Sequence, residues 1–257
     1  MKVIPCFILV VIIFSACKKE NTGYDTRFRG TVTLEFDNVA GGEDIRLNTG
    51  NYVNAAGETY SVRSLRYFVS NIVLVNTNGT EYVVPQDSSY FLVDESIRTS
   101  QPSLQVPEGE YSVLKFILGI DSLRSTMDLS KRTGVLAPTV STYLDENSGY
   151  VFFSLEGNSP QAPENRYQFH IAGYGGKTSP TINNIKNISI DLTQGGIVKV
   201  REGHESVIHI FADISRVFTG TADISLAQNN IIQFEPFSVN IANNYALMFR
   251  HDHTHNE

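Results

Sequence analysis

Short segments of alternating apolar and polar residues, each bounded by Gly, Pro, Asn or Ser, constrain the fold of this chain most strongly. Residues 31–36 alternate strictly and place Val32, Leu34 and Phe36 on one face, as in a half-buried β-strand. Residues 65–75 are rich in β-branched and aromatic residues and end at a turn signal that contains Asn and Gly. Both patterns predict β-structure from the start of the folded region.

Further strand-like runs follow along the chain. Residues 111–120 lack strict alternation, which predicts a strand buried on both faces. Residues 121–148 are mostly polar and predict a long excursion that contains a helical turn. The remaining strand candidates are residues 81–84, 90–93, 150–155, 166–171, 185–192, 196–200 and 207–212.

Together these runs predict an all-β fold, a single β-sandwich or partly open barrel of about ten short antiparallel strands. Helical patterning is scarce, and we expect one or two short helical turns near the C-terminus, at residues 213–218 and around Ile241 and Tyr245. Neither an internal repeat nor a break in composition divides the chain. We therefore expect residues 30–257 to form a single β domain.

The N-terminus has the pattern of a lipoprotein signal peptide. Its apolar run, residues 3–14, is shorter than the about 20 residues of a membrane-spanning helix, and small residues precede Cys17. We expect residues 1–16 to be removed, Cys17 to carry lipid, and residues 17–29 to form the lipidated cysteine and a flexible tether. An uncleaved anchor is the alternative. The expected location is the cell envelope, anchored to the outer membrane and either periplasmic or surface-exposed.

Cysteine content and charge exclude several kinds of site. Removal of the signal peptide takes away Cys6 and leaves Cys17, whose sulfur is consumed by lipid, so neither a disulfide nor a thiolate metal site can form in the mature chain. The net charge is −7 without long acidic runs, which argues against nucleic-acid binding because that function needs a basic surface.

Two isolated histidines lie in strand-like runs. His170 shares a face with Gln168 in the segment 167–176, and His209 shares a face with Val207 and Phe211. A partly buried neutral imidazole is either a metal ligand or a hydrogen-bonded structural residue, and the sequence leaves both readings open for each histidine.

A third set of histidines closes the chain. If the tail is extended, His251, His253 and His255 lie on one side of it, about 7 Å apart. Such a tract either wraps a metal ion or remains a solvated tail. Because imidazole dominates the donors and thiolate is lacking, a bound metal would be copper or zinc, and Cu²⁺ heads the affinity order for such sites.

Motifs of the common enzyme classes are lacking. The sequence contains neither a nucleophile elbow, nor a phosphate-binding loop, nor a dinucleotide fingerprint. The segment 204–209 resembles the zinc-protease motif, but its histidines are five residues apart and would point to opposite faces of a strand. We expect a protein without enzymatic activity.

Five segments carry a family resemblance: LRYFVSNIVL at 65–74, GIDSLR at 119–124, SGYVFFSLEG at 148–157, FHIAGY at 169–174 and MFRHDHTHN at 248–256. In this order they resemble the MbnP-like copper-binding family, in the form found in Bacteroidetes lipoproteins. The resemblance implies a secreted all-β protein whose relatives bind copper through histidines. By position, it implies that the ligands are His170, His209, His253 and His255.

One departure from the family concerns tryptophan. In some relatives a tryptophan near the copper is oxidised to kynurenine by a partner di-haem enzyme, and members of this type carry W-x-W shortly before N-S-G-Y. Here Leu144 and Glu146 occupy those positions, and the chain contains no tryptophan. Kynurenine chemistry is therefore excluded for this chain.

Two functions follow from the sequence. The first is a non-enzymatic envelope lipoprotein that binds copper, with His170 and His209 as central ligands, the tail as a lid, and a redox or transport protein of the envelope as a partner. The second is a surface-exposed binding or scaffold module for a glycan or a protein, which keeps the fold without a metal. Separate packing of His170 and His209 would favour the second function.

Overall fold

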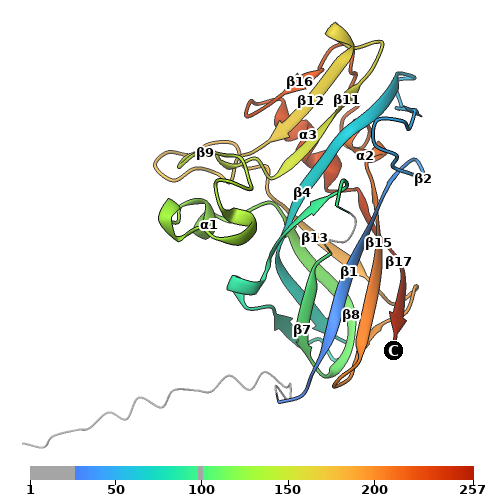
Figure 1. Cartoon of the computed structure of the whole chain (residues 1–257), viewed down its shortest axis with the longest axis vertical. Coiled ribbons are helices and arrows are strands. Elements are labelled where there is room, and N and C mark those ends of the chain that lie inside the picture. Colours follow the sequence, from blue (N-terminus) through green and yellow to red (C-terminus); the bar gives the residue numbers. More distant parts are fainter. Residues whose placement is uncertain (1–26, 98–100) are drawn as a thin grey trace, which may run out of the picture.

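Two β-sheets pack against each other around a shared core (Figure 1). The computed structural model describes residues 27–97 and 101–257, so the expected signal peptide and Cys17 lie outside the described residues. Within them, the smaller sheet has five strands in the order β17-β15-β1-β2, with β7 also paired to β1. These strands are β1 (Arg29–Ala40), β2 (Glu43–Asp44), β7 (Ser103–Pro107), β15 (Glu205–Asp213) and β17 (Phe249–Asn256).

The larger sheet has ten strands, and its main path is β13-β8-β4-β11-β12-β16. Strand β14 pairs with β8, and β3, β5 and β6 pair with β4. The bounds are β3 (Tyr52–Val53), β4 (Thr59–Asn76), β5 (Glu81–Val83), β6 (Tyr90–Asp94), β8 (Gly109–Leu118), β11 (Phe153–Asn158), β12 (Arg166–Ile171), β13 (Lys186–Asp191), β14 (Val198–Val200) and β16 (Ile231–Ile232). This arrangement confirms the predicted all-β sandwich or partly open barrel.

Short helices and one small hairpin complete the described part of the chain. Helix α1 and the first strand of the hairpin belong to the predicted excursion, which stands away from the two sheets (Figure 1). None of the helices in the described ranges is long and apolar enough to cross a membrane. The elements are α1 (Ser122–Ser125), α2 (Ser215–Phe218), α3 (Ser238–Tyr245), β9 (Tyr143–Asp145), β10 (Gly149–Tyr150) and the 3-10 turns Gln86–Ser88, Leu129–Lys131, Gly134–Leu136 and Pro163–Asn165.

The strands are not all antiparallel. β1 runs parallel to β15 over nine consecutive pairs, from Thr31 beside Glu205 to Val39 beside Asp213, and β12 runs parallel to β16. The prediction for residues 111–120 was also wrong. Strand β8 buries alternate residues from Leu114 to Leu118, and on its other face Lys115 reaches Glu81 at 2.7 Å. An apolar run therefore did not mean burial on both faces.

Strand β4 connects the two halves of the larger sheet. Its first half pairs with β11 and its second half with β8. The register shifts between Ser70 and Val73, where Asn71 adopts a φ of 52° and its side-chain amide donates to Asp121 at 2.7 Å. Asparagine tolerates this left-handed conformation better than most residues do, so it suits the bulge at which the sheet changes partners.

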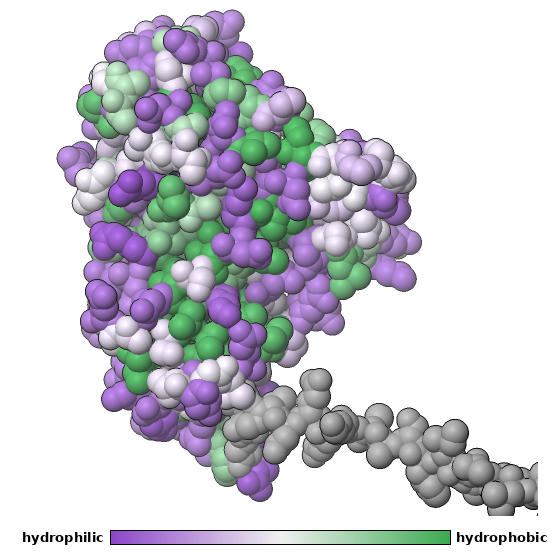
Figure 2. Space-filling view, turned by 180° about the vertical axis from the view of Figure 1, so that it is seen from behind, coloured by the Kyte–Doolittle hydropathy of each residue, from purple (hydrophilic) through white to green (hydrophobic). Residues whose placement is uncertain are grey.

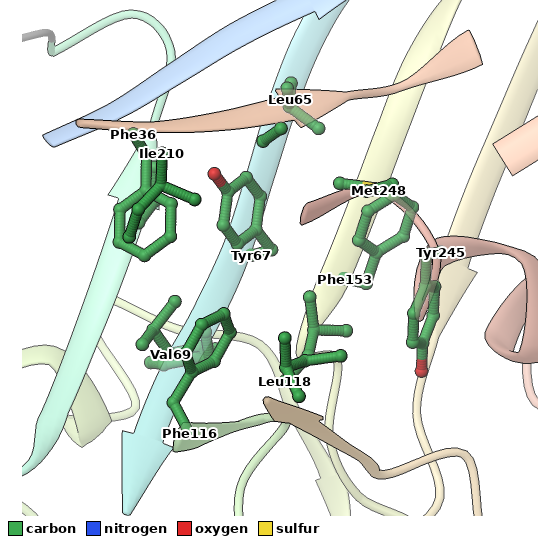
Figure 3. Packing of buried hydrophobic residues seen from close by; sticks show 14 of the residues in the cluster. Phe36, Leu65, Tyr67, Val69, Phe116, Leu118, Phe153, Ile210, Tyr245 and Met248 are labelled. Atoms are coloured by element: carbon green, nitrogen blue, oxygen red, sulfur yellow. The ribbon is translucent and has the colours of Figure 1, made fainter. Parts of the chain in front are cut away.

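Aromatic rings fill the space between the two sheets (Figure 3). Phe36 of β1 makes edge-to-face contacts, each with ring centroids 6.0 Å apart, with Tyr67 of β4, Phe116 of β8 and Phe249 of β17. Phe249 also lies 5.1 Å from Phe116. Such pairs each add about 0.5–1.5 kcal/mol beyond their burial. This aromatic quartet joins strands from both sheets, including the last strand of the chain.

The outer surface is not uniformly polar. On the face turned away from the viewer in Figure 1, apolar residues lie along the middle of the molecule with hydrophilic ones among and around them (Figure 2). Exposed apolar patches on a protein surface often mark contacts with a partner.

A buried carboxylate fixes the start of β4 to a distant loop. Glu58 accepts hydrogen bonds from the side chains of Asn54 and Ser225 and from the backbone amides of Leu226 and Ala227, at 2.6–3.0 Å. Burial by itself raises the pKa of Glu58, but these hydrogen bonds outweigh it and lower the pKa below its usual value. The ionised carboxylate therefore stabilises the fold.

We expect Glu58→Gln to lower the free energy of unfolding at pH 7 by about 1–3 kcal/mol, because buried donors lose a charged acceptor. The folded-state pKa is depressed, so this stabilisation is present above the unfolded pKa of about 4.3 and is lost as the pH falls through the folded pKa. Urea denaturation from pH 7 to pH 3 measures it, with the exposed Glu43→Gln as control. A constant difference between wild type and variant over that range would contradict the expectation.

Candidate metal centre

The parallel pairing of β1 with β15 creates the first part of the site. Its register places Glu35 directly beside His209. Successive side chains of a strand point to opposite faces of the sheet. Because Phe36 and Ile210 are buried in the core, Glu35 and His209 point to the outer face of the smaller sheet. The side chain of His209 is 17% exposed there.

A β-bulge in β17 brings the tail histidines to the same face. Ile208 and Ile210 of β15 pair with Thr254 and His251 of β17. One residue, His209, lies between the first two, whereas two residues, Asp252 and His253, lie between the second two. The extra residue changes the alternation of the strand. His253 and His255 therefore lie on the outer face with His209, and His251 turns the other way, beside Thr254.

Three imidazoles form one donor group on this outer face. His209, His253 and His255 each offer a ring nitrogen, and these nitrogens all lie within 4.8 Å of one another. The Nε2 atoms of His253 and His255 are 3.0 Å apart. In this arrangement one Nε2 carries a proton and donates a hydrogen bond to the other Nε2. A metal ion can take the place of that proton.

The rings of His209 and His253 are stacked, with centroids 4.2 Å apart and planes 10° from parallel. The in-plane lone pairs of stacked imidazoles lie in separate, nearly parallel planes, so they do not meet at one ion. One ring must therefore turn about its Cβ–Cγ bond when a metal binds. This torsion has a broad energy profile in histidine, so the turn is easy for the half-exposed His253.

Three carboxylates surround the imidazoles. Glu35 Oε2 lies 3.7 Å from Nε2 of His209, and Asp37 Oδ2 lies 3.6 Å from its Nδ1. Asp252 accepts a hydrogen bond of 2.7 Å from Nδ1 of His253. Glu35, Asp37 and His209 also form a second group of possible metal donors among the described residues.

The electrostatics of the site favour a cation. Burial, and then repulsion from the neighbouring Glu35, raise the pKa of Asp37 above its usual value, although His209 acts in the opposite direction. Beside Asp37 a cavity of about 150 Å³ opens, and its acidic lining residues are Glu35, Asp37, Asp44, Asp94 and Glu95. A bound cation would relieve the repulsion among these carboxylates.

His170 lies in the other sheet and belongs to neither donor group. As predicted, it shares a strand face with Gln168, and its Nε2 is 2.7 Å from Glu156. Glu156 in turn pairs with Arg63 at 2.7 Å. Burial raises the pKa of Glu156, but Arg63 and His170 outweigh it and the pKa is lowered. His170 is thus held by a hydrogen bond to Glu156, away from the three imidazoles.

The expected pairing of His170 with His209 is therefore not found, because their strands belong to different sheets with different partners. Separate packing was expected to favour a binding module without metal. The metal hypothesis nevertheless stands, since His209 forms a donor group with His253 and His255 instead. The tail was expected to act as a lid, whereas it is a sheet strand that supplies two imidazoles.

Two further expectations concern the tail and the tryptophan positions. The three tail histidines do not share one side, because the bulge separates His251 from the others. Leu144 is 46% exposed in the hairpin, and Glu146 pairs with Lys177 at 2.9 Å. Neither side chain contributes to a donor group within the described residues.

The carboxylates of the site could not be identified from the sequence. Alternation places Glu35 and Asp37 on the polar face of a strand, but it carries no information about the strand beside them. Asp252 stood out only as part of the histidine tract. A signal was available in the polar face of residues 31–37, because Glu35 and Asp37 are two acidic residues at strand spacing there.

Comparison with known proteins adds the family. A family model described as MbnP matches residues 29–237. The chain belongs to the MbnP family. Among solved structures, MbnP from Methylosinus trichosporium has a TM-score of 0.52 at 13% sequence identity, over 81% of this chain and 82% of that one, which shows a shared fold. A comparison with curated proteins returned no match.

The match confirms the family resemblance, and the first four of the five sequence segments lie within it. For this MbnP-family protein it covers the strands that carry His170 and His209, but it ends before β17. His253 and His255 are therefore placed at the site by the geometry of β17 and not by the family model.

Proposed function

We propose that this MbnP-family protein is a non-enzymatic lipoprotein of the cell envelope that holds one copper ion for capture or handling. The observation that carries the proposal is the group of three imidazole nitrogens, from His209, His253 and His255, within 4.8 Å of one another. Imidazole donors without thiolate suit copper and zinc, and copper has the higher affinity for such ligands.

Local interactions support this use of the histidines. The carboxylate of Asp252 holds the Nδ1 proton of His253, which leaves Nε2 of that ring as the donor. His253 and His255 are exposed enough for an ion to reach them, and the acidic cavity beside β1 attracts cations toward the same face. The site combines access, donors and a favourable potential.

Metal analysis tests this proposal. We expect the mature protein, solubilised in detergent, to take up about one equivalent of copper, and the variant His253→Ala/His255→Ala to take up little, because two of three strong donors are lost. His251→Ala, on the same strand but the opposite face, and His170→Ala, in the other sheet, should both retain wild-type uptake. Equal copper content in the double variant and the wild type would overturn the proposal.

The lipid anchor is a separate part of the proposal. We expect Cys17→Ser to abolish incorporation of radiolabelled fatty acid and to move the protein from the membrane fraction to the soluble fraction, because the acyl chains provide the membrane affinity. Extraction of membranes with carbonate distinguishes an anchored from a loosely bound protein. A serine variant that remains in the carbonate-washed membranes would indicate an uncleaved anchor instead.

A second candidate function is a binding module for a protein partner or a glycan. It is favoured by the apolar residues along the middle of the rear face of the molecule (Figure 2). The copper analysis separates the two candidates. A wild-type protein that takes up no copper would leave the binding module as the better function.

A further inference from the structure

Glu35 is spaced from His209 as a second ligand of the same ion would be. The distance between Glu35 Oε2 and His209 Nε2 is 3.7 Å. Charge-assisted hydrogen bonds between nitrogen and carboxylate are about 2.7–2.9 Å long, so this contact is too long for one. Two ligands at about 2.0–2.1 Å from one tetrahedral ion lie about 3.4 Å apart, which is close to the observed spacing.

The other two carboxylates occupy a different position around the rings. Asp37 faces Nδ1 of His209 at 3.6 Å, and Asp252 binds Nδ1 of His253 at 2.7 Å. A carboxylate that is hydrogen-bonded on that side of a ligating imidazole, as Asp252 is, holds its proton and orients it, whereas Asp37 lies too far from His209 for a hydrogen bond. The Nε2 atoms are then the donors, in agreement with the 3.0 Å approach between those of His253 and His255. Glu35 is the carboxylate on the Nε2 side.

Soft donors are engaged elsewhere in the described part of the chain. The sulfur of Met127 lies 3.7 Å from Arg124 in the excursion, and Met248 is 1% exposed in the core (Figure 3). Cu⁺ favours thiolate and thioether ligands, whereas carboxylate oxygen suits harder, divalent ions. An anionic ligand also attracts a divalent ion more strongly than a monovalent one.

From this arrangement we propose that Glu35 is the fourth ligand of the site and makes it selective for a divalent ion, Cu²⁺ or Zn²⁺, over Cu⁺. The inference rests on the proposed function, since it needs His209, His253 and His255 as the other three ligands. Strand β1 would then supply a metal ligand, in addition to its pairing with β15.

Parallel affinity measurements test the role of Glu35. The mature protein and its Glu35→Gln variant are titrated with Cu²⁺ against a competing chelator, with Zn²⁺ in the same way, and with Cu⁺ under anaerobic conditions against bicinchoninate. We expect Glu35→Gln to weaken Cu²⁺ and Zn²⁺ binding at least about tenfold and Cu⁺ binding less than about twofold. The electron paramagnetic resonance spectrum of bound Cu²⁺ should change because an anionic oxygen donor is lost.

Two further variants separate ligation from general electrostatics. Glu43→Gln removes the same charge from the exposed face of the neighbouring strand β2, outside the acidic cavity, and should change none of the three affinities more than about twofold. Glu35→Asp keeps the charge but withdraws the oxygen by one methylene, and we expect it to weaken Cu²⁺ binding and to alter the spectrum. Thermal unfolding of each variant verifies that the fold is retained.

The possible outcomes are distinct. Wild-type Cu²⁺ affinity and spectrum in Glu35→Gln, together with loss of binding in His253→Ala/His255→Ala, would overturn the role of Glu35 and leave the proposed function intact. An equal loss of Cu²⁺ and Cu⁺ affinity in Glu35→Gln would overturn the selectivity. Unchanged copper binding in the double histidine variant would instead overturn the proposed function itself.

Discussion

The packing of Phe249 into the aromatic quartet is the interaction on which the rest of the structure depends. Phe249 is the first residue of β17, and its ring lies 5.1–6.0 Å from the rings of Phe36, Tyr67 and Phe116. It fixes the position of β17 along β15, and Arg250 then lies 4.0 Å from the ring of Phe211. A terminal segment without such an anchor is commonly disordered. Here the anchor makes it a strand with a defined register.

The defined register has consequences for the outer face. Because Phe249 and Arg250 are fixed, the bulge places His253 opposite His209, and the parallel pairing on the other side of β15 places Glu35 there as well. Two donor groups that share His209 thus lie over β15, one with the imidazoles of His253 and His255 and one with the carboxylates of Glu35 and Asp37. This crowding of donors is unfavourable for packing alone, since like charges repel, and a cation would make it favourable.

Local sequence patterns predicted much of the framework. The alternation that placed Val32, Leu34 and Phe36 in the core was confirmed, and short helices occur where helical patterning was found, as α2 and α3. The run at 111–120 was wrongly predicted to be buried on both faces, because Lys115 forms an ion pair with Glu81 on the outer face of the sheet. The long polar excursion was also expected, although the stacking of Arg132 on Tyr143, 3.9 Å away, was not.

The sequence by itself determined the β class, the polar and apolar faces of most strands, the histidine-rich donor set and the exclusion of tryptophan chemistry, because each depends on composition or on neighbours one to four residues apart. Only the tertiary structure decided which donors meet. It separated His170 from His209, joined His209 to the tail and placed Glu35 beside it. These outcomes depend on strand pairing between distant residues and on one extra residue in β17, and both are set by packing of the core, which local periodicity does not encode.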